Sequence, residues 1–182
     1  MEPELLSIST ADGTLLGASC WTVPDARATI ILHPATAVTQ SYYTAFAAYL
    51  AGRGFNVLTY DYRGTGRSRP RSLRGYHATM REWVDEDVGA VTRWAAGCFP
   101  GLPLLAVGHS VGGHAIGLSS ETARLRAAVL IASHAGVSAL VRAPAPRHPA
   151  GSGRGGQGRG RAARRRRVHA RVGLDRGHGR HD

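Results

Sequence analysis

The 182-residue sequence predicts an α/β fold, a mostly parallel sheet with flanking helices. Two observations predict it. Short apolar runs rich in β-branched residues alternate with segments of helical periodicity, and glycine or proline residues end the helical segments. Strands separated by helices are joined by right-handed crossovers, so these strands are expected to run parallel. The length suits one domain that buries a real core.

The first part of the chain predicts a hairpin, a strand and a helix. Residues 5–10 and 15–21 are apolar runs on either side of Asp12-Gly13, a pair typical of a hairpin turn. Residues 28–33 (ATIILH) are typical of a buried strand. The helix that follows has apolar side chains at helical spacing and ends at two glycines: Tyr43, Phe46, Ala47 and Leu50, then Gly52 and Gly54.

The next part predicts three more strands and two more helices. The strands are residues 55–60 (FNVLTY), 102–108 (LPLLAVG) and 127–133 (AAVLIAS). Thr79 and Glu82 form a capping-box pattern that starts the first helix. One face of this helix is apolar apart from Asp87: Met80, Val84, Asp87, Val88, Val91, Trp94 and Ala95. The second helix is expected to include residues 114–120 (HAIGLSS).

The charge divides the chain in two. Residues 1–141 hold 11 Arg and 10 acidic residues, whereas residues 142–182 hold 12 Arg and 2 acidic residues, so most of the net charge of +11 lies in this basic tail. The tail has few apolar residues larger than Ala and Pro: Val168, Val172 and Leu174. Such a segment cannot offset its ordering entropy by burial. We therefore predict a globular domain over residues 1–141 and a disordered Arg/Gly-rich tail over residues 142–182.

Composition also indicates where the protein acts. Cys20 and Cys98 form neither a metal-binding spacing nor a disulfide framework, which favours a reducing cytoplasm. The N-terminus lacks the basic start and apolar stretch of a signal peptide, and no apolar run reaches the roughly 20 residues of a membrane span. We expect a cytoplasmic protein with no membrane partner. No phosphate-loop or metal-ligand motif is present, so no cofactor or metal is expected.

One motif points to chemistry. Gly108-His109-Ser110-Val111-Gly112 matches G-x-S-x-G and stands between an apolar strand and a small-residue helix start. This context predicts a nucleophile elbow, with Ser110 in a strained backbone conformation between glycines that avoid clashes. The Val111 N–H and the helix dipole would then stabilise an oxyanion. The alternative is an ordinary strand-to-helix turn with an incidental serine.

Two further loops belong to the same edge of the predicted sheet. The second oxyanion donor should follow the strand that ends at His33. Pro34 has no N–H, so the donor would be Ala35, or else Thr36. The alternative is a proline-containing loop that only leaves the sheet. Residues 60–68 (YDYRGTGRS) follow the next strand, where a structural ion pair between Asp61 and Arg63 is the favoured interpretation.

Residues 1 to about 140 resemble the α/β-hydrolases, in the branch of serine aminopeptidases and lysophospholipase-type esterases. The segments that carry the resemblance are LHPAT, YLAGRGFNVLTYDYRGTGRS, LPLLAVGHSVGG and AAVLIAS. The resemblance implies a triad in the chain order Ser-Asp-His. It implies Ser110 as the nucleophile and Val111 and Ala35 as backbone oxyanion donors. The match covers only the N-terminal half of that fold, so strands carrying the acid and the base should follow.

No histidine of the sequence is well placed as the base. The resemblance makes His33 structural, and the side chain of His109 should point away from the adjacent Ser110. The remaining histidines lie before or on helices, at the end of the last predicted strand, and in the tail: His77, His114, His134, His148, His169, His178 and His181. Asp175 and His178 have the family order, but a triad needs two separate strand tips. We interpret the catalytic Asp and His as missing.

The tail and the function are predicted together. An Arg-, Gly-, Ala-, Pro- and His-rich tail in a chain without Lys is typical of GC-rich DNA translated in a shifted frame. A genuine arginine-rich arm that binds nucleic acid and an unrecognised structured segment are the alternatives. We predict a serine hydrolase of small-molecule esters or amides that is truncated and inactive as written. The alternative is a non-catalytic scaffold whose tail binds nucleic acid or other polyanions non-specifically. Truncation after residue 141 would leave residues 127–133 as an exposed edge strand.

Overall fold

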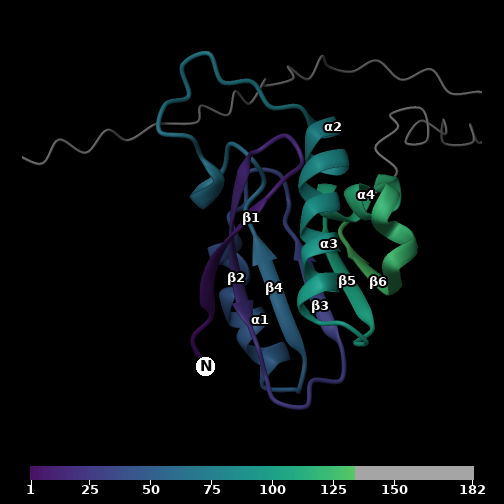
Figure 1. The fold of residues 1–182 in the computed structure, drawn as a ribbon. Coiled ribbons are helices and arrows are strands. Elements are labelled where there is room, and N and C mark those ends of the chain that lie inside the picture. The colour runs from purple at the N-terminus through teal and green to yellow at the C-terminus, as the bar shows by residue number, and fades with distance from the viewer. Residues whose placement is uncertain (134–182) are drawn as a thin grey trace, which may run out of the picture. The chain divides into compact units, whose positions relative to one another are not determined.

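A computed structural model describes residues 1–133, which form a six-stranded sheet with helices on both faces (Figure 1). The strands are β1 (Glu4–Ser9), β2 (Leu15–Trp21), β3 (Thr29–His33), β4 (Asn56–Tyr60), β5 (Leu104–His109) and β6 (Leu125–Ile131). The α-helices are α1 (Thr44–Ala51), α2 (Met80–Glu82), α3 (Gly89–Cys98) and α4 (Val111–Leu118). The shorter helical segments are η1 (Gln40–Tyr43), η2 (Gly66–Ser68), η3 (Trp83–Val88) and η4 (Ser120–Arg124). The predicted α/β class is confirmed.

The strand order β1-β2-β4-β3-β5-β6 places a topological switch point beside β3. From β3 the chain crosses through α1 to β4 on one side, and then through α2, η3 and α3 to β5 on the other. β1 and β2 pair antiparallel as the predicted hairpin, while β4, β3, β5 and β6 are parallel. Ligands of open α/β sheets bind where the strand order reverses, so the loops after β3 and β5 are the expected site.

The sheet has one apolar core on each face. Ile30 and Leu32 of β3 pack with Ala47 of α1, whereas Ile31 between them packs with Val91 of α3 and Ala115 of α4. This alternation follows from the two-residue period of a strand buried on both faces. The helices therefore hold β3 from both sides and present its carboxyl end to the site.

Two helices differ in detail from their predicted apolar faces. Phe46 and Met80 were expected on buried faces, but their side chains are exposed. For α1 the buried face follows Tyr43, Ala47 and Ala51 instead. The capping box at Thr79 is confirmed with both of its hydrogen bonds. It begins a helix that passes into the π-helical segment η3, whose wider turn a spacing pattern of 3.6 residues does not anticipate.

β6 is the edge strand of the part of the sheet that the structure describes. It pairs only with β5 there, and Val129, Leu130 and Ile131 are about half exposed. Within residues 1–133 the last predicted strand therefore lies at an edge of the sheet with apolar side chains partly exposed. No helix of these residues is long and apolar enough to cross a membrane. The predictions for His134 and for the basic tail fall on residues 134–182, which lie outside the described residues.

Candidate active site

Ser110 forms the sharp turn between β5 and α4 as a single residue. Its backbone has φ 53° and ψ −115°, a conformation that a residue other than glycine rarely adopts. Three hydrogen bonds hold the turn: the Ser110 N–H donates to the Ile131 carbonyl at 2.8 Å, and the Ser110 carbonyl accepts from the Gly113 N–H at 3.1 Å and from the Ser133 hydroxyl at 3.0 Å. The strained conformation that the sequence predicts for Ser110 is confirmed.

Close backbone packing explains the two glycines of the turn. A Cβ atom on Gly108 would lie 2.5 Å from the Gly113 nitrogen, and one on Gly112 would collide with the backbone carbonyls of His33 and Pro34. A side chain on Gly108 would push α4 away from β5, and one on Gly112 would push α4 away from the end of β3. The glycines therefore bring α4 against the loop after β3, which is the geometry of a nucleophile elbow.

The first peptide group of α4 has an N–H without a partner in the described chain. Within residues 1–133 the Val111 N–H and the Ser110 hydroxyl have no hydrogen-bond partner. Val111 is the first residue of α4, so its N–H carries the positive end of the helix dipole. Val111 and His114 also line a hollow of about 700 Å³, which Met80 and Val84 close from the neighbouring helical segment.

The loop after β3 lies beside the elbow, but one of its backbone N–H groups already donates a hydrogen bond within the fold. His33 pairs with Gly108 across the two parallel strands, which sets Ala35 next to the turn. The Ala35 N–H donates to the Tyr43 hydroxyl at 3.0 Å. The oxyanion role predicted for Ala35 therefore requires this hydrogen bond to open. The Thr36 N–H has no hydrogen-bond partner within residues 1–133.

Two histidines near the elbow are engaged with tyrosines. His33 is fully buried with its Nδ1 2.9 Å from the Tyr60 hydroxyl, and burial lowers its pKa to about 3. Nδ1 of His109 lies 3.0 Å from the Tyr43 hydroxyl, so His109 points toward α1. Both rings hold the edge of the sheet together. The structural role implied for His33 agrees with this burial.

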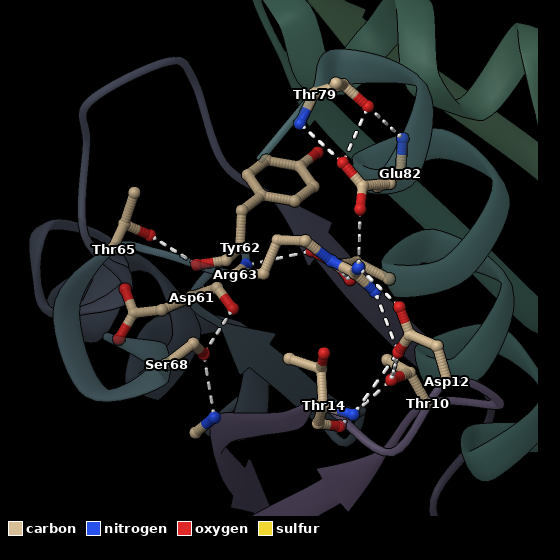
Figure 2. Close-up of polar contacts among 12 residues, drawn as sticks. Thr10, Asp12, Thr14, Asp61, Tyr62, Arg63, Thr65, Ser68, Thr79 and Glu82 are labelled. Carbon is tan, nitrogen blue, oxygen red and sulfur yellow. Dashed lines mark hydrogen bonds and ion pairs between the residues drawn. The ribbon is translucent and has the colours of Figure 1, made fainter. Parts of the chain in front are cut away.

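The loop after β4 is held by charges, but not by the pair expected from the sequence. The Asp61–Arg63 ion pair is wrong: Asp61 accepts hydrogen bonds from the Gln40 and Arg67 backbone N–H groups, both at 2.8 Å. Arg63 binds three other carboxylates: Asp12 at 2.6 Å, Asp87 at 2.7 Å and Glu82 at 3.3 Å. Figure 2 shows its guanidinium between the hairpin turn and the capping box of α2. Both residues follow the end of β4, and they serve different neighbours: Asp61 binds the backbone of η1 and η2, whereas Arg63 joins the hairpin turn to α2 and η3.

Burial and pairing shift the carboxylates of this network in opposite directions. The hydrogen bond from Arg63 holds the pKa of Asp12 well below its usual range. Burial raises the pKa of Asp87 to about 6, although Arg63 contacts both of its oxygens. Asp87 was visible in the sequence as the polar exception on an apolar helix face. Its pairing with Arg63 was not visible in the sequence, because the two residues lie on segments that meet only in the folded chain.

Within residues 1–133 no three histidine, cysteine or acidic side chains lie close enough together to hold a metal ion. The chemistry that these residues offer is instead a hydroxyl on a strained turn with backbone N–H groups beside it. This is the arrangement that stabilises a developing oxyanion in acyl transfer.

Comparison with known proteins agrees with this geometry. The model of one protein family, serine aminopeptidase S33, matches residues 24–171. Among solved structures, XC6422 from Xanthomonas campestris, described as an α/β serine hydrolase without a lid, has a TM-score of 0.58 at 21% identity. A soluble variant of monoglyceride lipase from Saccharomyces cerevisiae has a TM-score of 0.59 at 20% identity, and a thermostable carboxyl esterase from Bacillus coagulans 0.56 at 19%. No curated protein matches the chain.

The matches cover more of this chain than of the other proteins. The three alignments include 75%, 71% and 71% of this chain, but 63%, 44% and 44% of XC6422, the lipase and the esterase. The chain thus spans less than two thirds of the length of these structures. Their shared feature is the fold around the sheet described above.

Proposed function

Because the chain belongs to the serine aminopeptidase S33 family, we propose that it carries the nucleophile of a serine hydrolase that acts on a small-molecule ester or amide. The observation that carries this proposal is the strained Ser110 turn, whose hydroxyl and neighbouring Val111 N–H have no partner within residues 1–133. Strain of this kind persists only where the surrounding fold enforces it, and it concentrates at reactive residues. The esterase and lipase neighbours support the reaction class.

The proposed reaction passes through an acyl-enzyme. The Ser110 oxygen attacks the substrate carbonyl carbon, and the carbonyl oxygen takes up the electron pair of the broken π bond. The Val111 N–H, at the start of α4, donates to that oxygen together with a second backbone N–H from the loop after β3. Collapse expels the alcohol or amine and leaves an ester on Ser110. Water then releases the acid and restores the hydroxyl.

Both steps need a base, and we propose none within residues 1–133. The base must take the Ser110 proton during attack and return it to the leaving group. His33 is buried against Tyr60, and His109 is bound to Tyr43. We therefore predict that the chain as written hydrolyses esters only at the background rate.

Ester turnover with added imidazole tests the nucleophile separately from the base. Imidazole in solution can accept the proton that a missing histidine would take. We expect nitrophenyl acetate hydrolysis by the full chain to be at background without imidazole and to gain a component with imidazole that Ser110→Ala removes. Ser41→Ala, at an exposed serine, is the matched control and should retain it. An imidazole effect that is equal in Ser110→Ala would overturn the nucleophile.

Turnover that depends on Ser110 without imidazole would overturn the predicted inactivity. It would show that the chain itself supplies a base, and we would search residues 134–182 first. His134 and the tail histidines would then be replaced singly by glutamine, and the variant that loses turnover would identify the base.

The second candidate function is a non-catalytic scaffold, and the 12 Arg of residues 142–182 favour it. Arginines on one segment bind phosphate groups with an affinity that falls steeply with salt. We expect the full chain to bind single- and double-stranded DNA without sequence preference, and deletion of residues 142–182 to abolish this binding, as measured by fluorescence anisotropy at two salt concentrations. Binding that prefers one sequence or resists salt would contradict non-specific contacts.

A further inference from the structure

The Tyr43 hydroxyl joins the two loops that flank the proposed reaction centre. It accepts the Ala35 N–H at 3.0 Å from the loop after β3, and it lies 3.0 Å from Nδ1 of His109, the residue before Ser110. These two partners are far apart in sequence: Ala35 follows β3 and His109 ends β5, and these two strands are adjacent and parallel. One oxygen atom therefore sets the distance between the loop after β3 and the elbow.

The Tyr43 side chain is packed too tightly to move away from the Ala35 N–H. Its side chain is 9% exposed and packs in the apolar core on the α1 face with Leu32 and Ala47. Its ring meets the His109 ring edge-on, with centroids 6.1 Å apart. Withdrawing it from Ala35 would open this core. The Ala35 amide is thus committed to the fold, and a different N–H must face the reaction centre.

The next amide along the loop, that of Thr36, is free of such a commitment within residues 1–133. Residues 35–38 form a turn in which the Val38 N–H donates to the Ala35 carbonyl at 3.2 Å, with Ala37 at φ 60°. Thr36 occupies the second position of this turn, is exposed, and its N–H has no partner within residues 1–133. A turn with a positive φ at its third position has the shape of a type II turn. The turn thus fixes the Thr36 peptide while leaving its hydrogen available.

We propose that Tyr43 is a positioning residue that ties the loop after β3 to the elbow, so that the Thr36 N–H, and not the Ala35 N–H, joins Val111 in holding the oxyanion. The inference rests on the proposed function of Ser110, since an oxyanion arises only if that serine attacks a carbonyl. Burial raises the pKa of the Tyr43 hydroxyl above its ordinary value, so the hydroxyl stays protonated and both of its hydrogen bonds persist through the neutral range.

The test measures acetylation of Ser110 by nitrophenyl acetate in the presence of imidazole. Tyr43→Phe keeps the ring and removes only the hydroxyl, and Tyr42→Phe, at a neighbouring tyrosine that is 72% exposed, is its control. Thr36→Pro removes the N–H, and proline suits the second position of such a turn. Thr36→Ala keeps the N–H. Each variant is assayed for its maximal acetylation rate, its half-saturating ester concentration and its thermal unfolding midpoint.

We expect Tyr43→Phe to lower the maximal rate about tenfold, equivalent to about 1.4 kcal/mol, at an unchanged half-saturating concentration. Tyr42→Phe should match the unsubstituted chain. Thr36→Pro should acetylate about a hundredfold more slowly than Thr36→Ala, the typical effect of losing one oxyanion donor. A merely structural role for Tyr43 would move the unfolding midpoint without this selective loss of the maximal rate.

Four results would overturn the proposal. Faster acetylation of Tyr43→Phe would mean that the hydroxyl blocks Ala35, and an unchanged rate would mean that it does nothing. Equal rates for Thr36→Pro and Thr36→Ala would exclude the Thr36 N–H, and this comparison still decides if Tyr43→Phe fails to fold. No acetylation of Ser110 in the unsubstituted chain would overturn the proposed function itself, and the inference with it.

Discussion

The loop after β4 and the nucleophile elbow lie at the same edge of the sheet but treat their polar groups in opposite ways. In the loop, Asp61 and Arg63 are almost fully buried, and each has several partners within the described chain. At the elbow, the Ser110 hydroxyl and the Val111 N–H have none within residues 1–133. Buried polar groups that are fully paired rigidify a fold, whereas half-buried groups without a partner are available to a ligand. The charged loop is thus structural, whereas the proposed function places the reaction at the uncharged turn.

Removing the cation of the structural loop should have the largest effect on stability. Arg63→Met leaves Asp87 buried without its partner, and breaking a buried ion pair from one side costs about 3 to 5 kcal/mol. We expect a lower free energy of unfolding by that amount in urea titrations. Arg81→Met is the control because its pair with Asp85 is exposed, and it should change stability by less than about 0.5 kcal/mol. Equal losses for both variants would contradict a structural role for the Arg63 network.

The pH dependence of stability should distinguish a buried neutral histidine from a paired one. The pKa of His33 is about 3 in the fold and near its ordinary value of 6.5 in the unfolded chain, so the unfolded chain binds the extra proton. Stability is therefore fully present above pH 6.5 and falls toward pH 3, by up to about 1.4 kcal/mol per pH unit.

Asp87 titrates with the opposite sign, because its raised pKa of about 6 makes the fold take up a proton first as the pH falls. The quantity to measure is therefore the difference in unfolding free energy between the unsubstituted chain and His33→Gln. This difference should shift against the unsubstituted chain as the pH falls below 6.5. A difference that is constant from pH 7 to pH 4 would contradict the buried neutral state of His33.

Relieving the strain at Ser110 should have a smaller effect: it should raise the stability of the fold while removing the proposed chemistry. Ser110→Gly should stabilise the fold by about 1 kcal/mol, because glycine tolerates φ 53°. Ser110→Ala keeps the strain and should not gain stability, which makes it the control for thermal unfolding. Both variants should lose acetylation. A loss of stability in Ser110→Gly would mean that the turn is not strained.

The local parts of this fold could be predicted from the sequence. Hairpin, buried strands, capping box and G-x-S-x-G turn depend on neighbouring residues, so Asp12-Gly13, Thr79 with Glu82, and Ser110 were each placed correctly. The π-helical segment was missed because Trp83–Val88 carries no local signature, and its turn is set by packing.

Contacts between distant segments could not be predicted. Arg63, after β4, pairs with Asp12 in the hairpin turn. Tyr43 contacts Ala35 after β3 and His109 at the end of β5. Spacing patterns report one element at a time, so they suggest which residues are polar or buried but not which of them meet. The role expected for Ala35 depended on such a contact, as its amide faces Tyr43.

The most direct test of the account is the site of acetylation after brief treatment of the full chain with nitrophenyl acetate and imidazole, mapped by peptide mass spectrometry. The account predicts that Ser110 is acetylated faster than any other serine, including Ser41. Acetylation of Ser110 no faster than that of Ser41 would contradict the central claim that this turn holds a nucleophile.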